Sequence, residues 1–313
     1  MIELLKTKKK IVINSDIDGI LSGLILQEFL ACEIVGFCNS ANKLWISEDQ
    51  YEYRKDFVFI DMFVTQKNIA CIDQHIVSFN EEHNARLAAN PNKINPNILR
   101  GKCFHPKSSY YTKYPFGTVH FIIADLEKNN FNLDRLSLFN ENKDVQSIDF
   151  FLRADDALIT SVEKYKENAL DWWTWLLDYS ATGKMTQQFI DYTYSGLNAA
   201  ANKKKVEQKL LGQPFCCEKP DGGFGEIADI DNLLLPNFKK YVDYLAEISN
   251  LKPLETSQKY KIVTGIPARI NFNHHHAETF MKESKVLDKK VFSYAFVKSF
   301  GQENSFSFTY FLD

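Results

Sequence analysis

The sequence predicts an α/β protein whose first half is built on a parallel sheet. Short apolar runs, many of them β-branched, recur between residues 11 and 73 and are apolar on both faces, as in strands that helices cover on both sides. Residues 19–30 follow the first run and place apolar side chains at helical spacing. We therefore expect an N-terminal parallel-sheet domain with helices on both faces, a helical connector, and a smaller α+β C-terminal domain.

The elements of the N-terminal domain follow in order from these patterns. The residues between 80 and 116 are polar, contain four prolines and predict a long loop. Thr118 is expected to cap a helix that runs to about residue 128. Residues 149–212 are expected to be mostly helical, with the cluster of Trp172, Trp173 and Trp175 packed in the core or at a contact between domains. The expected strands are residues 11–14, 33–38, 57–61 and 69–73.

The C-terminal part of the chain has a different pattern. A segment rich in Pro and Gly, residues 214–225, is typical of a linker. Beyond it, residues 260–272 and 291–312 predict strands, and Gly301-Gln-Glu-Asn is a hairpin-like connection. The expected organisation is residues 1–200 as the first domain, 201–225 as the connector, and 226–313 as a substrate-binding or interaction domain.

Composition limits the class of protein. The chain of 313 residues is long enough for two domains, and its net charge of −3 excludes a strongly basic coat for nucleic acid. None of the six cysteines forms a CxxC pair, so we expect reduced thiols. We expect no signal peptide, and no apolar stretch reaches the ~20 residues that a membrane span requires. We expect a cytoplasmic protein with no membrane partner.

Three expected strands run into aspartates. The first leads into Asp16-Ile-Asp18-Gly19, the third into Asp61, and the fourth into Asp73-Gln74-His75. Because the carboxyl ends of parallel strands meet at one edge of a sheet, these side chains should converge where such sheets bind ligands. Carboxylates gathered at one edge repel one another unless a cation neutralises them, and they suit Mn²⁺ or Mg²⁺.

At these positions the sequence resembles the DHH phosphoesterase superfamily. Asn14 to Ser22 is similar to the family's first motif, Phe59-Ile-Asp61 to its second, and Cys71 to His75 to its Asp-His-His motif. Arg153-Ala-Asp155-Asp156 stands where the aspartate of the fourth motif belongs. The resemblance covers about the first 160 residues. It implies a centre of two cations, Mn²⁺ or Mg²⁺, with ligands from Asp16, Asp18, Asp61, Gln74 and Asp155.

The resemblance also implies a reaction. It is hydrolysis of a phosphodiester in a nucleotide or a short single-stranded nucleic acid, by water that the cations activate. Asp61 would bridge the cations, and His75 would contact the phosphate and stabilise its developing charge. Asp61 and His75 are thus the expected catalytic residues.

The motifs depart from the family pattern at three positions. Val12 stands where many members have a metal-binding His, Asn14 where the exonuclease branch has an Asp, and Gln74 where the first His of Asp-His-His belongs. A neutral amide oxygen binds transition metals less well than imidazole, so one cation site is expected to be weakened or lost. A protein that binds nucleotide, nucleic acid or a protein partner without hydrolysis is therefore a second hypothesis. The sequence leaves a homodimer or another protein complex open.

A third hypothesis uses the same first motif. Asp16-Ile-Asp18-Gly19 also resembles the nucleophile motif of haloacid-dehalogenase-type phosphatases, in which Asp16 would attack the phosphate. That family places a turn and a flap after the motif, whereas here a helical pattern starts at once. Asp61 and Asp73 also have no role in the reaction of such a phosphatase.

Candidate substrate-binding residues lie outside the acidic motifs. Lys107 and Lys113 belong to a stretch of cations and tyrosines that would suit phosphates and bases, or else form a solvated loop. Arg269 and His274 lie in the second domain, where the family carries a substrate-binding loop with a His. For the run of three His that starts at His274, an exposed or capping role is the alternative.

Overall fold

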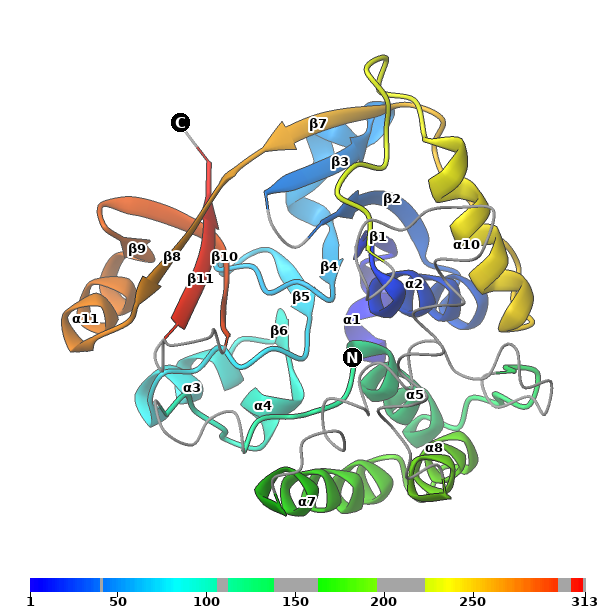
Figure 1. Cartoon of the computed structure of the whole chain (residues 1–313), viewed down its shortest axis with the longest axis horizontal. Coiled ribbons are helices and arrows are strands. Elements are labelled where there is room, and N and C mark those ends of the chain that lie inside the picture. The colour runs from blue at the N-terminus through cyan, green and yellow to red at the C-terminus, as the bar shows by residue number, and fades with distance from the viewer. Residues whose placement is uncertain (40–41, 106–111, 138–162, 196–222, 298–304, 312–313) are drawn as a thin grey trace.

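Two sheets organise the chain. A computed structural model describes residues 1–39, 42–105, 112–137, 163–195, 223–297 and 305–311. A seven-stranded sheet has the order β6-β5-β4-β1-β2-β3-β7, and a four-stranded sheet has the order β8-β11-β10-β9 (Figure 1). Strands β6 to β2 of the first sheet are parallel, β3 and β7 are antiparallel additions at its edge, and the second sheet is antiparallel throughout. The predicted α/β class is confirmed at this level.

The elements have the following bounds. The strands of the first sheet are β1 Lys10–Asn14, β2 Glu33–Cys38, β3 Lys43–Ser47, β4 Val58–Ile60, β5 Ala70–Ile72, β6 Lys93–Ile94 and β7 Tyr260–Thr264. The strands of the second sheet are β8 Ile266–Asn271, β9 Lys285–Val286, β10 Lys289–Phe296 and β11 Ser305–Tyr310. The helices are α1 Ile2–Thr7, α2 Ile17–Leu30, η1 Glu48–Asp56, α3 Glu81–Ala88, α4 Pro96–Leu99, α5 Thr118–Lys128, α7 Glu163–Tyr179, α8 Lys184–Ser195, α10 Pro236–Ile248 and α11 His274–Glu283.

The two faces of the first sheet bury different partners. Alternate residues of β1 point to opposite faces: Ile11 and Ile13 join the core that α2, α5 and α10 complete, and Val12 joins the other core. That other face packs mainly against the aromatic side chains of the second sheet and α11, with single side chains from α3, α4 and η1. The expectation of helices on both faces is therefore correct for one face, while a second sheet covers most of the other.

Phenylalanine builds the contact between the sheets. Phe59 of β4 lies 5.8 Å from Phe292 of β10, and Phe63 lies 5.1 Å from Tyr294, both edge to face. On the second sheet, Tyr294 also donates its hydroxyl to the carbonyl of Val77, 3.1 Å away. These contacts fix the second sheet beside the loops that follow β4 and β5.

The strand order creates a switch point in the middle of the sheet. From β1 the chain moves to β2 on one side and later returns to β4 on the other side of β1. The carboxyl ends of β1 and β4 therefore border the crevice in which open α/β sheets bind ligands. Gly19 allows α2 to begin there, because a Cβ at this position would lie 2.2 Å from the carbonyl oxygen of Asn14.

Several local predictions differ from the structure. The stretch 80–116, expected as loop, contains α3, β6 and α4. The N-cap of α5 is Gly117, so Thr118 is the first helical residue, and His274 begins a helix that Asn273 caps. Trp172 and Trp173 are buried as expected, at 0% and 3% exposure, whereas Trp175 is half-buried against the same core.

The domain bounds at 200 and 225 stay a prediction, and the connector lies largely outside the described residues. Within the described part, α10 packs against α2, and β7 pairs with β3 in the first sheet. Residues 236–264 thus belong to the same core as the N-terminal strands. Among the described helices, none has both the length and the apolarity that crossing a bilayer requires.

Candidate functional site

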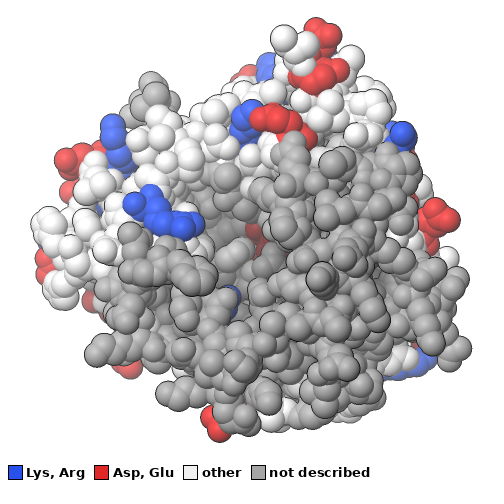
Figure 2. Space-filling view, in the orientation of Figure 1, with Lys and Arg blue, Asp and Glu red and all other residues white. Residues whose placement is uncertain are grey.

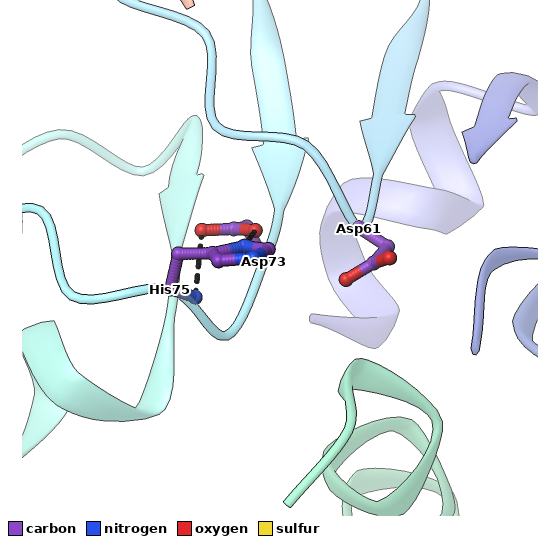
Figure 3. Close-up of side chains that lie close together, drawn as sticks. All are labelled: Asp61, Asp73 and His75. Carbon is purple, nitrogen blue, oxygen red and sulfur yellow. Dashed lines mark hydrogen bonds and ion pairs between the residues drawn. The ribbon is translucent and has the colours of Figure 1, made fainter. Parts of the chain in front are cut away.

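Polar side chains from three neighbouring strand ends meet at the switch point. Asn14 ends β1, Asp61 follows β4 and Asp73 follows β5. The amide nitrogen of Asn14 donates to the Oδ2 of Asp61 across 3.0 Å, which joins the first two strands directly. Figure 3 shows Asp61 just beyond the end of one strand and the pair of Asp73 and His75 just beyond the end of its neighbour.

Asp61 is held in an uncommon backbone conformation. Its φ is +60°, in the left-handed region that non-glycine residues rarely occupy, and its exposure is 0%. Its backbone nitrogen donates to the carbonyl of Ile72 at 2.8 Å, and its Oδ1 accepts from the hydroxyl of Thr118 at 2.8 Å. Such a conformation costs on the order of 1–3 kcal/mol and persists where the surroundings impose it, often at functional sites.

Asp73 orients the ring of His75. Its Oδ1 lies 2.7 Å from the Nδ1 of His75, and its Oδ2 accepts from the backbone nitrogen of His75 at 3.0 Å. Asn95, at the N-terminus of α4, donates to the same Oδ2 at 3.1 Å. A proton on Nδ1, shared with the carboxylate, leaves Nε2 as the ring's second functional atom. The side chain of His75 is 29% exposed, so a ligand can reach it.

Asp16 and Asp18 are engaged by helix N-termini. Asp16 caps α2, because its Oδ1 accepts from the backbone nitrogen of Gly19 at 3.0 Å. Asp18 lies at the start of α5, where the backbone nitrogens of Thr118 and Val119 donate to its two oxygens at 2.8 Å each. The positive end of the α5 dipole stabilises that carboxylate. Since Thr118 contacts both Asp18 and Asp61, these two aspartates lie at the same edge of the sheet. We call this edge, at the carboxyl ends of β1, β4 and β5, the rim.

Gln74 is buried beside His75. Its exposure is 3%, and its Nε2 lies 3.5 Å from the Nε2 of His75. The amide of Asn97 donates to the backbone carbonyl of Gln74 at 2.8 Å and fixes this turn. The side chain of Gln74 therefore lies on the His75 side of the rim.

A cavity of about 110 Å³ opens between this rim and the second sheet. Asp61 and His75 line it from one side, and the second sheet contributes the residues Ser293, Ser307 and Thr309. Apolar side chains, among them Phe63 and Phe308, complete the lining. Figure 2 shows a few Asp or Glu atoms near the centre of the view. The volume is well below the ~300 Å³ or more of a pocket that encloses a whole ligand, and suits one small polar group.

Three side chains of the site lie close enough together that they could hold a divalent cation. One ligand atom from each of Asp61, Asp73 and His75 lies within 4.8 Å of the others. Two carboxylates and an imidazole are ligands that suit Mn²⁺, and a His whose other ring nitrogen contacts a carboxylate is a usual arrangement at metal sites. Both oxygens of Asp61 and both oxygens of Asp73 accept protein donors, so a cation would share these oxygens with them.

The remaining predicted residues are more scattered. Arg269 is exposed on β8, directly opposite Ser307 of β11, and therefore projects from the same sheet face as that cavity residue. Lys113 is half-buried and is not among the residues that line the cavity. His274 is 89% exposed at the start of α11, where its Nδ1 lies 3.5 Å from Glu278. Asp155 and Lys107 lie outside the described residues.

Several residues of the rim were not assigned a role from the sequence. Asn14 entered only as a missing ligand and Thr118 only as a cap, yet both bind Asp61. Asn95 was not predicted as a site residue. Asn95-Pro96 is nevertheless a common start of a helix, in which Asn is the N-cap and Pro is the first helical residue. That signal predicts α4, while the contact between Asn95 and Asp73 follows from the pairing of β5 with β6.

Comparison of the chain with family models, with curated proteins and with solved structures gave no match.

Proposed function

We propose that the protein is a metal-dependent phosphodiesterase acting on a nucleotide or a short single-stranded nucleic acid. The observation that carries the proposal is the meeting of Asp61 with the Asp73–His75 pair beside a cavity at the switch point of the sheet. The order of the acidic motifs, which resembles that of the DHH phosphoesterases, supports the same reaction class.

In this proposal, Asp61, Asp73 and His75 hold a divalent cation, Mn²⁺ or Mg²⁺. A bound cation supplies positive charge that acidifies water and offsets the charge of the phosphate. Thr118 and Asn14 fix the carboxylate of Asp61, so that it needs no reorganisation when a ligand arrives. Asp73 holds the ring of His75 through Nδ1, which leaves Nε2 as the atom that would bind the cation.

The second sheet offers the complementary contacts. The hydroxyls of Ser293, Ser307 and Thr309 can donate to phosphate oxygens in the cavity. Arg269, on the same face as Ser307, would contact the next charged group of a longer substrate. A cavity of about 110 Å³ would take the phosphoryl group, while the rest of the nucleotide lies outside it.

Binding without hydrolysis is the second candidate function. It is favoured by the protein donors that already engage Asp16 and Asp18, because ligands committed to a cap and a helix N-terminus attract a cation less strongly. The phosphatase alternative has less support. Asp16 would have to attack phosphate while its oxygens accept from Gly19 and Asn14, and α2 begins at Ile17 with no intervening flap.

The test is hydrolysis of bis(p-nitrophenyl) phosphate and of short oligonucleotides with Mn²⁺. Asp61→Asn should lower the rate by on the order of 10²–10³-fold, the usual loss when one transition-state stabiliser is removed. Asp134→Asn is the matched control, since Asp134 is an exposed aspartate paired with Lys184 and should leave the rate unchanged. No cleavage by the wild type, with retained binding of a nucleotide, would favour the second candidate. Equal rates in wild type and Asp61→Asn would refute the proposed mechanism.

A further inference from the structure

A neutral side chain joins two carboxylates of the rim. The Nδ2 of Asn14 lies 3.0 Å from the Oδ2 of Asp16 and 3.0 Å from the Oδ2 of Asp61. An amide NH₂ group has two hydrogens and can donate one to each oxygen. Asn14 is 3% exposed, so both contacts are protected from water. The amide therefore holds together two buried acidic groups that would otherwise repel each other.

The third carboxylate on this side of the rim is also satisfied by the protein. Both oxygens of Asp18 accept from the first turn of α5, and the fit is tight, because a Cβ on Gly117 would lie 2.8 Å from one of them. A cation placed among Asp16, Asp18 and Asp61 would have to displace the amide of Asn14. It would also compete with the backbone donors of α5 for Asp18.

The other side of Asp61 is built differently. There the neighbours are Asp73 and the ring of His75, which is partly exposed and lines the cavity. Asp73 also accepts protein donors, from His75 and Asn95. What distinguishes the side of Asp16 is the amide of Asn14, which donates to Asp16 and Asp61 at once.

We propose that the centre holds a single cation, on the side of Asp61 that faces His75, and that the amide of Asn14 permanently occupies the position between Asp16 and Asp61 that a second cation would need. This inference rests on the proposed function. It makes Asn14 a positioning residue that sets the number of cations, and it limits the reaction to one that a single cation can support.

The experiment counts Mn²⁺ in the full chain. Wild-type protein and Asn14→Asp are loaded with Mn²⁺ and dialysed, then measured by elemental analysis and by calorimetric titration. We expect one Mn²⁺ per chain for the wild type and two for Asn14→Asp, because the new carboxylate removes the amide donors and adds a ligand. Without metal, Asn14→Asp should melt well below the wild type, since three acidic groups then adjoin. Mn²⁺ should recover most of that loss.

Asn84→Asp is the matched control. Asn84 is also buried, at 9% exposure, but its amide donates to the backbone carbonyl of Ile98 and not to a carboxylate. This variant should lose stability without gaining a cation, and Mn²⁺ should not raise its melting temperature more than that of the wild type.

Each result decides the question. Two Mn²⁺ in the wild type would overturn the single-cation inference and leave the proposed function intact, whereas none would overturn both. One Mn²⁺ in both the wild type and Asn14→Asp, with no recovery by metal, would mean that Asn14 does not control a second position. If Asn14→Asp does not fold, the wild-type count alone supports or overturns the inference.

Discussion

The hydroxyl of Thr118 offers a direct test of how Asp61 is held. Thr118 donates its Oγ1 to the Oδ1 of Asp61 at 2.8 Å and its backbone nitrogen to the Oδ2 of Asp18 at 2.8 Å. Thr118→Val removes the first bond and keeps the second, because valine has nearly the same shape and retains the backbone donor. Both Thr118 and Asp61 have an exposure of 0%, so water cannot replace the lost donor.

The expected loss follows from the charge of the acceptor. Hydrogen bonds to charged groups contribute roughly 1.5–3 kcal/mol, and a buried acceptor left without its donor bears the desolvation penalty. We therefore expect Thr118→Val to lower the free energy of unfolding by about 2 kcal/mol. Thr118→Ser keeps the hydroxyl and loses one buried methyl group, which costs about 0.8 kcal/mol.

Urea unfolding in the presence of EDTA measures both variants without metal. The midpoint of Thr118→Val should fall further than that of Thr118→Ser, and the slope of the transition should not change. A valine variant as stable as the serine variant would show that the hydroxyl does not stabilise Asp61. The account of how α5 positions that carboxylate would then be wrong.

Three further predictions concern other residues. Gln74→His should raise Mn²⁺ affinity, because imidazole binds Mn²⁺ better than an amide oxygen does; unchanged affinity and stoichiometry in a calorimetric titration would mean that residue 74 does not face the metal. Gly117→Ala should lower the urea midpoint, since its Cβ would lie 2.8 Å from Asp18 while the backbone φ of −75° suits alanine, and an unchanged midpoint would contradict the tight fit between α5 and Asp18. His83 stacks on Phe79 with ring centroids 3.9 Å apart, and burial, followed by the nearby charge of Arg86, lowers its pKa to about 3. Because the unfolded chain then binds the proton more readily, stability should fall as the pH drops below about 6.5, by about 1.4 kcal/mol per pH unit from this residue until its folded pKa is approached. His83→Phe should weaken that dependence when urea midpoints at pH 7.5 and 5.5 are compared, and an equal dependence in both proteins would remove His83 as its source.

Local pattern was enough to predict the elements that carry the rim. The strands β1, β4 and β5 and the helix α2 follow from short apolar runs and helical spacing, both of which act within a few residues. The convergence of aspartates was also predictable, since it requires only that the strands be parallel. The same kind of signal is present for α10, whose Phe238, Tyr241, Val242 and Leu245 are buried at helical spacing behind Pro236.

Only the tertiary structure decided what each polar side chain contacts. The pairing of β7 with β3 joins residues more than 200 positions apart, and no local pattern specifies that register. The same holds for Thr118. Its neighbours in sequence predict a helix cap, whereas in the structure its hydroxyl at the start of α5 donates to Asp61. Asn14 differs from aspartate by one amide group, and its effect depends on two carboxylates lying 3.0 Å from that group. The sequence determined which charged side chains reach the rim. Packing between distant segments determined which of these side chains accept hydrogen bonds from the protein itself, because hydrogen bonds depend on distances and angles that only the assembled fold defines.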